Sequence, residues 1–258
     1  MSDKVLVSAA DGVLEIRFNR ADKKNALTDD MYAAVVEALQ RADREPALRV
    51  VLISGEGAAF SAGNDLQDFM QNPPDLSGGA QAGPVWRFMQ ILSTLRKVVV
   101  AAVQGPAVGV GSTLLLHCDL VVAADTARFS LPFINLGLVP EFGSTLLLPR
   151  LMGHQLAAEI TLLGEPFDAA TAQRLGLVNR VVPEAALRDT ARELARKLAA
   201  KAPEALLLTK QLLRNPQGTL SERIAEEAGL FSKRLRSAEF REAASAFFEK
   251  RAPDFSKL

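Results

Sequence analysis

Two glycine-rich segments and one glutamate carry the chemistry that this sequence suggests. The segments are Phe60–Leu66 (FSAGNDL) and Gly105–Thr113 (GPAVGVGST), and the glutamate is Glu141 in VPEFGST. Glycine at the change from strand to helix allows a tight turn and a close approach of the backbone to a ligand. Unpaired N–H groups at such a turn carry partial positive charge. Two of them aimed at one point would stabilise a carbonyl oxygen that becomes negative, and Glu141 would carry the proton.

Strand-like runs lead into both glycine segments, and helices separate these runs. Apolar or alternating patterns predict strands at Val13–Phe18, Val50–Ser54, Val98–Val103 and Leu120–Ala123. A first helix is expected after the N-cap residue Thr28. Its apolar positions recur every four residues, at Met31, Val35 and Leu39. With a second helix expected over Trp86–Leu95, the alternation indicates a layered α/β fold.

From about Leu146 onward the periodicity predicts helices and no strands. The expected helices are His154–Leu163, Ala169–Leu175, Glu184–Ala200, Pro203–Leu213, Thr219–Leu235 and Ala238–Lys250. The last one carries Phe240, Phe247 and Phe248, which so short a helix cannot bury alone. They would pack against another subunit, line the ligand entrance or dock on the rest of the chain, and the sequence leaves these alternatives open. Gln71–Ala80 is rich in turn formers and is predicted to be a mobile loop where a lid would lie.

Composition disfavours several classes of function. Lys plus Arg and Asp plus Glu number 30 each among 258 residues, so no basic field favours nucleic acid. The apolar runs fall far short of the ~20 residues of a membrane span, and no signal-peptide pattern is present. Cys118, His117 and His154 are too few for a zinc site, so we expect a reduced core thiol and structural histidines. We therefore expect an intracellular protein, which would be cytoplasmic in a bacterium; in a eukaryote Ser256-Lys257-Leu258 would be a peroxisomal address.

Over essentially the whole chain, the motifs resemble those of the crotonase (enoyl-CoA hydratase/isomerase) superfamily. Asn19–Leu27 resembles the loop that holds the nucleotide end of coenzyme A, and Phe129–Thr145 resembles the catalytic stretch. Phe60–Leu66 and Gly105–Thr113 resemble the two parts of the oxyanion hole, and Phe247–Phe255 resembles the terminal helix. One such motif is a weak signal, but their occurrence together in the family's order is specific.

The resemblance implies a spiral of repeated β-β-α turns followed by a helical trimerisation region. We place the α/β core, with the CoA-binding and active sites, at residues 1–195, and the C-terminal helical oligomerisation region at 196–258. Trimers, often paired into hexamers, are implied in the same way. Coenzyme A arrives as part of an acyl-CoA thioester substrate, so no separate cofactor or metal is expected, and neither nucleic acid nor membrane is an expected partner.

The resemblance also implies which residues form the site. The oxyanion donors should be the backbone N–H groups of Asn64 and Val110, with Glu141 as the catalytic carboxylate. Residues expected at the substrate are Lys24, Ala26, Ala62, Asp65, Leu66, Phe133, Leu136 and Lys250. Lys23 with Lys24, and Lys250 with Arg251 from a neighbouring subunit, would contact phosphates, although exposed lysines are often only solvated. Asp65 is expected to cap the short helix that follows it.

Departures from the family pattern narrow the reaction. Hydratases of the superfamily use two glutamates to place and deprotonate a water, and Thr113 and Phe133 stand at those positions. Neither carries a proton at neutral pH. Glu141 matches the acid of the Δ3,Δ2-enoyl-CoA isomerase branch, which implies conversion of 3-enoyl-CoA to 2-trans-enoyl-CoA. Water exclusion and a Glu141 pKa raised toward neutrality are expected from a pocket of Phe133, Leu136, Leu138 and Phe142.

Other functions stay open at this point. An isomerase of ring-epoxide (oxepin-type) acyl-CoA esters would place an acid at the same position, and a hydratase-like enzyme could act on another acyl-CoA. Outside enzymes, the alternatives are a non-catalytic acyl-CoA binder and an RNA-binding relative. Balanced charge argues against RNA, and the retained hole segments with Glu141 argue against an inactive scaffold.

Overall fold

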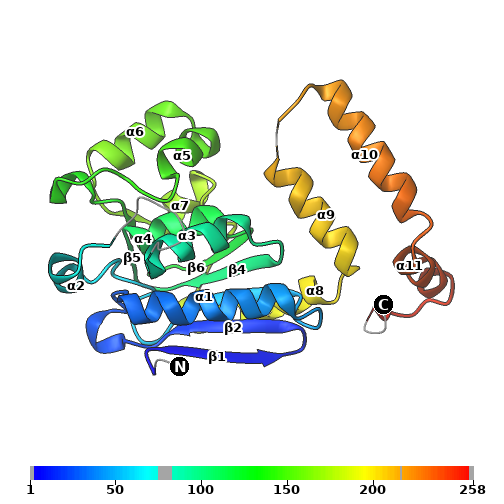
Figure 1. Cartoon of the computed structure of the whole chain (residues 1–258), viewed down its shortest axis with the longest axis horizontal. Coiled ribbons are helices and arrows are strands. Elements are labelled where there is room, and N and C mark those ends of the chain that lie inside the picture. The colour runs from blue at the N-terminus through cyan, green and yellow to red at the C-terminus, as the bar shows by residue number, and fades with distance from the viewer. Residues whose placement is uncertain (1–2, 75–82, 216, 256–258) are drawn as a thin grey trace. The chain divides into compact units, whose positions relative to one another are not determined.

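The computed structural model describes residues 3–74, 83–215 and 217–255 (Figure 1). The chain divides into two compact units, Met1–Arg196 and Lys197–Leu258. The strands described in this chain belong to the first unit, and the described elements of the second unit are helices.

Six strands of the first unit form its main sheet, in the order β1-β2-β3-β4-β6-β9. Their bounds are Val5–Ala10, Val13–Phe18, Val50–Gly55, Val98–Val103, Leu120–Ala124 and Arg180–Val182. β1 and β2 are antiparallel, and the later pairs, from β2–β3 to β6–β9, are parallel. Every residue of β3 and β4 is buried, as parallel strands covered on both faces require, and this explains their unbroken apolar sequences. The strands predicted at Val13–Phe18 and Val98–Val103 are confirmed to the residue.

A smaller sheet contains β5 (Pro106–Val108), β7 (Arg128–Ser130) and β8 (Phe167–Asp168). From β4 to β9 the chain passes back and forth between the two sheets, contributing to the small sheet after β4 and again after β6. This path is the spiral of strands and helices that the sequence predicts. It also brings the ends of β3 and β4, where the glycine segments begin, to one side of the main sheet.

The prediction that the second half holds no strands is wrong. β8 and β9 lie there, with two and three residues respectively. Elements this short show no periodicity in the sequence. They form because each extends an existing sheet edge: β8 pairs with β7, and β9 pairs with β6.

Helices cover the sheets of the first unit. They are α1 (Asp29–Arg44), α2 (Leu66–Gln71), α3 (Pro84–Thr94), α4 (Val110–Thr113), α5 (Ser144–Met152), α6 (His154–Leu162), α7 (Ala169–Arg174) and α8 (Leu187–Ala199), with single 3-10 turns at Ala21–Lys23, Leu114–His117, Ile134–Leu136 and Glu184–Ala186. α1 packs against α3 and the first three strands, and it buries the predicted positions Met31, Val35 and Leu39. Thr28 occupies the N-cap, but its hydroxyl donates to Asp30 and does not cap a backbone N–H, which corrects that detail.

The second unit contains α9 (Pro203–Arg214), α10 (Leu220–Arg234) and α11 (Ala238–Phe248). α10 begins with a capping box formed by Thr219 and Glu222. The Arg234 guanidinium pairs with Glu204 and, at 2.6 Å, with Glu239, so one side chain joins all three helices. Large apolar side chains nevertheless remain exposed along α10 and α11: Leu220, Ile224, Phe231, Phe247 and Phe248.

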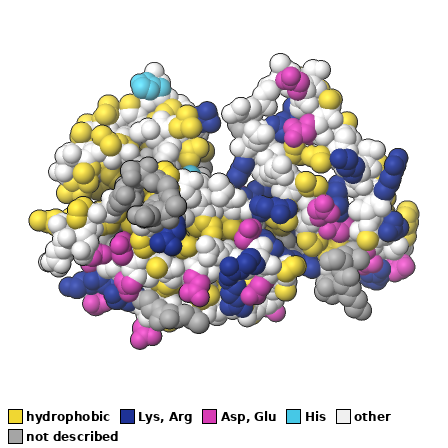
Figure 2. All heavy atoms as spheres, in the orientation of Figure 1, with side chains coloured by type: hydrophobic (Ala, Val, Ile, Leu, Met, Phe, Trp, Pro, Cys, Tyr) yellow, Lys and Arg dark blue, Asp and Glu magenta, His cyan; other side chains and the backbone are white. Residues whose placement is uncertain are grey.

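Exposed apolar residues also gather on the first unit. Figure 2 shows hydrophobic side chains over α5 and α6, which include Leu146, Leu151, Leu156 and Leu162. Among the described helices, none combines the length and the apolar character needed to cross a bilayer. Within the predicted loop Gln71–Ala80, Gln71 ends α2, whereas residues 75–80 lie outside the described residues, as do Ser256-Lys257-Leu258. The loop and the peroxisomal address therefore stay predictions.

Candidate active site

The two glycine segments lie directly against each other. The Ser61 amide donates to the Pro106 carbonyl at 3.1 Å, and the Val108 amide donates back to the Ser61 carbonyl at 2.9 Å. Gly63 has a φ of +90°, and a Cβ on it would lie 2.7 Å from the Val108 carbonyl oxygen. A side chain at residue 63 would therefore clash with backbone, so glycine is required for this approach.

This contact places the proposed oxyanion donors on neighbouring turns. Val110 begins α4, whose first turn closes by bonds from Ser112 and Thr113 to the Gly109 carbonyl. On the other segment, the Leu27 amide donates to the Gly63 carbonyl, and the Asp65 amide donates to the Leu27 carbonyl. The Asn64 amide, between them, takes no part in these bonds. Within the described chain, no backbone acceptor is found for the N–H group of Asn64 or Val110. Such a pair of amides can bind a carbonyl oxygen that becomes negative.

Glu141 precedes a sharp turn in which Phe142 and Gly143 have φ values of +59° and +70°. Its Oε1 accepts a hydrogen bond from the Thr113 hydroxyl at 2.5 Å, and Thr113 is the last residue of α4. Its Oε2 is buried and has no hydrogen-bond partner among the described residues. Burial raises the pKa of Glu141 to about 7, against the opposing effect of the Thr113 hydrogen bond. α4 thus provides the Val110 amide at its first residue and, at its last residue, the Thr113 hydroxyl that binds the Glu141 carboxylate.

The surroundings of Glu141 differ in part from the predicted pocket. Phe133 and Phe142 are buried, but Leu136 and Leu138 are each 51% exposed, which corrects their expected role in excluding water. The Ile134–Leu136 turn ends at Gly137 with a φ of +67°, and this abrupt end leaves the neighbouring leucines at the surface. The predicted rise in the Glu141 pKa is present, although these two leucines are not enclosed.

Two aromatic residues near the site, Tyr32 and His117, were not assigned to it from the sequence. The Tyr32 hydroxyl donates to the side-chain carbonyl of Asn64, and burial together with the charge of Glu141 raises the Tyr32 pKa well above its ordinary value. His117 stacks on Phe142, with ring centroids 3.9 Å apart. Tyr32 follows Met31 on the buried face of α1. A hydroxyl group at such an apolar position was the sequence signal that could have indicated a role for Tyr32 at the site.

The proposed CoA-binding residues divide into three groups. Lys24 and Ala26 lie in a loop that contacts the first glycine segment, because the Ala62 amide donates to the Lys24 carbonyl at 2.8 Å. Lys24 is exposed, whereas Ala26 and Ala62 are partly buried. Leu66 is 51% exposed at the start of α2. Lys250 belongs to the second unit, and its contact with the substrate stays a prediction.

The carboxylate of Asp65 has a structural role, and its expected contact with substrate stays a prediction. It caps α2 by accepting from the Gln67 and Asp68 amides, as the sequence also suggests. It forms an ion pair with Arg20 at 2.6 Å, and this hydrogen bond holds the Asp65 pKa below its ordinary value. With these contacts in place, the side chain serves the loop that carries Lys24 and Ala26.

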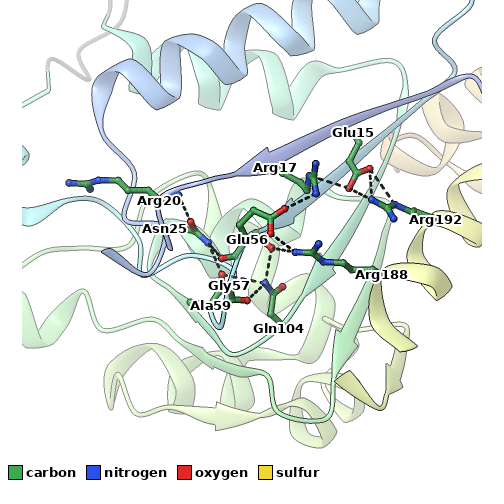
Figure 3. Close-up of polar contacts among 11 residues, drawn as sticks. Glu15, Arg17, Arg20, Asn25, Glu56, Gly57, Ala59, Gln104, Arg188 and Arg192 are labelled. Atoms are coloured by element: carbon green, nitrogen blue, oxygen red, sulfur yellow. Dashed lines mark hydrogen bonds and ion pairs between the residues drawn. The ribbon is translucent and has the colours of Figure 1, made fainter. Parts of the chain in front are cut away.

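A network of side-chain amides holds the same loop (Figure 3). Asn25 is fully buried; its Oδ1 accepts from the Arg20 amide at 2.8 Å, and its Nδ2 donates to the carbonyls of Glu56 and Ala59 at 2.9 and 2.7 Å. Gln104 donates to the carbonyls of Gly55 and Gly57 at 2.8 and 3.0 Å. The loop after β2, the loop after β3 and the end of β4 are therefore joined by hydrogen bonds.

Among the described residues, no cluster of three or more His, Cys, Asp or Glu side chains could hold a metal ion. Cys118 is a partly buried thiol that contacts the Leu114 carbonyl.

Comparison with known proteins identifies the family. The family model for enoyl-CoA hydratase/isomerase matches residues 8–257. The chain belongs to the enoyl-CoA hydratase/isomerase family. The predicted resemblance and fold are thereby confirmed, and the family acts on acyl-CoA substrates.

Members of the enoyl-CoA hydratase/isomerase family with different activities are similar to this chain. The 1,2-epoxyphenylacetyl-CoA isomerase of Escherichia coli is 37% identical, and the alignment covers 99% of each chain. The 2,3-dehydroadipyl-CoA hydratase of the same organism is 36% identical over 98% of each. A solved structure from Magnetospirillum magneticum, described as a candidate enoyl-CoA hydratase/carnithine racemase, is 48% identical with a TM-score of 0.94, covering 99% of this chain and 100% of that one.

Proposed function

We propose that this enzyme is an acyl-CoA isomerase that moves the double bond of a 3-enoyl-CoA thioester to give 2-trans-enoyl-CoA. The single observation that carries the proposal is the buried Glu141 carboxyl, with one oxygen unpartnered among the described residues and a pKa raised to about 7. A general base working near neutral pH needs a pKa in this range.

In the proposed reaction, the thioester oxygen binds to the N–H groups of Asn64 and Val110. Glu141 removes a proton from C2, and the electron pair of that C–H bond spreads into a dienolate whose negative oxygen the two amides stabilise. The protonated Glu141 then returns the proton to C4, and the double bond ends between C2 and C3. One carboxyl suffices because it accepts and donates the same proton in sequence, and no oxidant, metal or further cofactor is required.

Hydration fits these residues less well. A hydratase of this family would need a second acidic group to place and deprotonate water, and Thr113 and Phe133 stand at the corresponding positions. Thr113 instead donates its hydroxyl proton to Glu141. This bond favours the ionised carboxylate, which is the form that a base requires.

The test is the substitution Glu141→Gln, which keeps the size of the side chain but removes its proton-transfer capacity. We expect isomerisation of 3-hexenoyl-CoA to be abolished while binding of a short acyl-CoA persists. Glu165→Gln is the matched control, because Glu165 is an exposed glutamate. A Glu141→Gln variant with near-normal turnover would refute the proposed role of Glu141.

A second candidate is isomerisation of an aromatic-ring epoxide carried on CoA, a reaction that also needs one acidic group. The 37% identity to the 1,2-epoxyphenylacetyl-CoA isomerase over nearly the full length of both chains favours this candidate. Parallel assays with 3-hexenoyl-CoA and with 1,2-epoxyphenylacetyl-CoA separate the two. The substrate with the higher kcat/KM identifies the activity, and loss of both activities in Glu141→Gln would show that one carboxyl serves both.

The second unit is proposed to mediate oligomerisation. Phe247 and Phe248 are 78% and 80% exposed, and patches of large apolar side chains at a surface indicate contact with another chain. A homotrimer, alone or paired as a hexamer, follows from the family's organisation. In such an assembly Lys250 of a neighbouring chain would approach the phosphates of the bound CoA ester.

A further inference from the structure

We propose that His117 is a positioning residue, which fixes the Glu141 carboxyl by holding the Phe142 peptide in place. The inference rests on the proposed role of Glu141 as the proton carrier. It concerns a buried imidazole to which the proposed reaction gives no part.

The turn after Glu141 needs support from its surroundings. Phe142 has a φ of +59°, in the left-handed region that side-chain-bearing residues seldom adopt, and Gly143 follows with a φ of +70°. A backbone of this kind persists only where neighbouring groups hold it. On the near side, the Glu141 carbonyl accepts bonds from the Ser144 hydroxyl at 2.6 Å and the Ser144 amide at 3.1 Å.

His117 supplies the support on the far side. Its Nε2 lies 2.8 Å from the Phe142 carbonyl oxygen. A carbonyl oxygen can only accept, so Nε2 carries the proton, and this contact selects one tautomer of the ring. The same ring stacks on Phe142 with an interplanar angle of 25°. One residue therefore restrains both the carbonyl and the side chain of Phe142.

A row of buried rings prevents Phe142 from moving away from this contact. The Phe88 ring lies 5.5 Å behind Phe142, and the Tyr32 ring lies 5.2 Å behind Phe88. These rings belong to α3 and α1, which pack against each other. The row ends at the Tyr32 hydroxyl, which donates to Asn64. The same stack thus contacts the residue proposed as an oxyanion donor and the turn that carries the base.

Among the described residues, the Glu141 carboxyl itself has one hydrogen-bond partner, the Thr113 hydroxyl on Oε1. A single hydrogen bond leaves the carboxyl free to rotate, so the position of Oε2 depends on the backbone turn. If the His117 donor is lost, the Phe142 peptide can rotate and Oε2 can reach water. Misplacement of a reacting group by about 1 Å can cost about 10²-fold in rate.

The test compares His117→Gln with His117→Met, which are similar in length but differ in the presence of an N–H donor. We expect His117→Met to lower kcat about 10- to 100-fold with little change in KM, and His117→Gln to recover most of the loss. His154→Met is the control, because His154 is exposed. If His117→Met does not fold, His117→Phe replaces it, since phenylalanine keeps the ring stack without the donor.

A second readout does not depend on turnover. In protein labelled with ¹³C at the glutamate carboxyls, the signal that titrates near pH 7 and is missing in Glu141→Gln belongs to Glu141. In His117→Met this midpoint should fall toward the ordinary value of glutamate, because the carboxyl becomes more hydrated. An unchanged kcat and midpoint in a folded His117→Met would overturn the inference while leaving Glu141 as the base. If Glu141→Gln stays active, the proposed function fails, and the titration alone decides whether His117 positions the carboxyl.

Discussion

The two oxygens of the Glu141 carboxyl have different surroundings. Oε1 accepts from Thr113, whereas Oε2 is buried without a partner among the described residues. Burial favours the neutral acid and the Thr113 hydrogen bond favours the anion, and burial has the larger effect on the pKa. A carboxyl poised near pH 7 can both take up and release a proton, as the proposed reaction requires.

This balance predicts the pH dependence of the wild-type enzyme. The base must be ionised, so kcat/KM should be constant well above pH 7 and should fall about tenfold per unit below it. Thr113→Val removes the interaction that lowers the Glu141 pKa, and the midpoint should therefore move to higher pH. The measurement is a pH profile of kcat/KM with 3-hexenoyl-CoA.

Thr126→Val provides the control for that profile. Thr126 also donates to a glutamate, Glu184, but both groups are at the surface. Its substitution should leave the midpoint unchanged. A midpoint in Thr113→Val that is unchanged or moves to lower pH would contradict the assignment of Thr113 as the hydrogen-bond donor that favours the anion.

The sequence pointed to Glu141 as the candidate carboxylate, but it did not predict correctly which apolar side chains around Glu141 are buried. Phe133 and Phe142 are buried as expected, whereas Leu136 and Leu138 remain half exposed. Burial of an apolar side chain depends on the path of the turn that carries it, and the Gly137 conformation that directs this turn leaves no periodic signal in the sequence. The contacts of Tyr32 and His117 near the site were not predicted, because their partners are 32 and 25 residues away in the sequence.

Among the elements, the packing of the two glycine segments determines where the Asn64 and Val110 amides lie. Gly63→Ala would place a Cβ 2.7 Å from the Val108 carbonyl oxygen at a φ of +90°. We expect a loss of stability of about 1–3 kcal/mol from the strained backbone. If the Asn64 amide is displaced as well, turnover should fall about 10²–10³-fold. Thermal unfolding and kcat measure the two effects separately.

Gly229→Ala is the matched substitution for this experiment. Gly229 lies within α10, and beyond its chain neighbours and the nearby backbone of its own helix, no atom of the described residues lies within 4 Å of a Cβ built on it. Alanine favours helix over glycine by about 1 kcal/mol, so this variant should be slightly more stable and equally active. Unchanged turnover in Gly63→Ala would show that the approach of the two segments is not needed to place the amides.

Many of the longer elements of the fold were accessible from the sequence, but the strand β1, the helix α5 and the shortest strands were not predicted. β2 and β4 were predicted to the residue, because alternation and unbroken apolar character extend over whole strands. β5, β7, β8 and β9 have two or three residues and owe their existence to pairing across the spiral. Such pairing depends on the tertiary path of the chain, which a local pattern does not contain.

At the scale of the whole molecule, the three helices of the second unit leave large apolar side chains exposed to solvent. Phe231, Phe247 and Phe248 are each more than 60% exposed, although Arg234 ties the helices together. This pattern is typical of a surface that another chain covers.

We expect light scattering after gel filtration to give the mass of a trimer or hexamer. Phe247→Glu introduces a charge into the exposed apolar surface and should shift the mass toward the monomer of 27.7 kDa. Leu6→Glu, a similar change at a partly exposed position on β1, should leave the mass unchanged. A monomeric wild-type protein would rule out the proposed role of the second unit.

The buried carboxamide of Asn25 holds the loop that we propose for binding the nucleotide end of a CoA ester. Its hydrogen bonds to Arg20, Glu56 and Ala59 are made entirely within the chain itself. A recognition loop that is already rigid loses little conformational freedom on association. Affinity for the adenine and phosphate portion should therefore vary little from one thioester to another. Discrimination between substrates is then left to the residues that surround the acyl group.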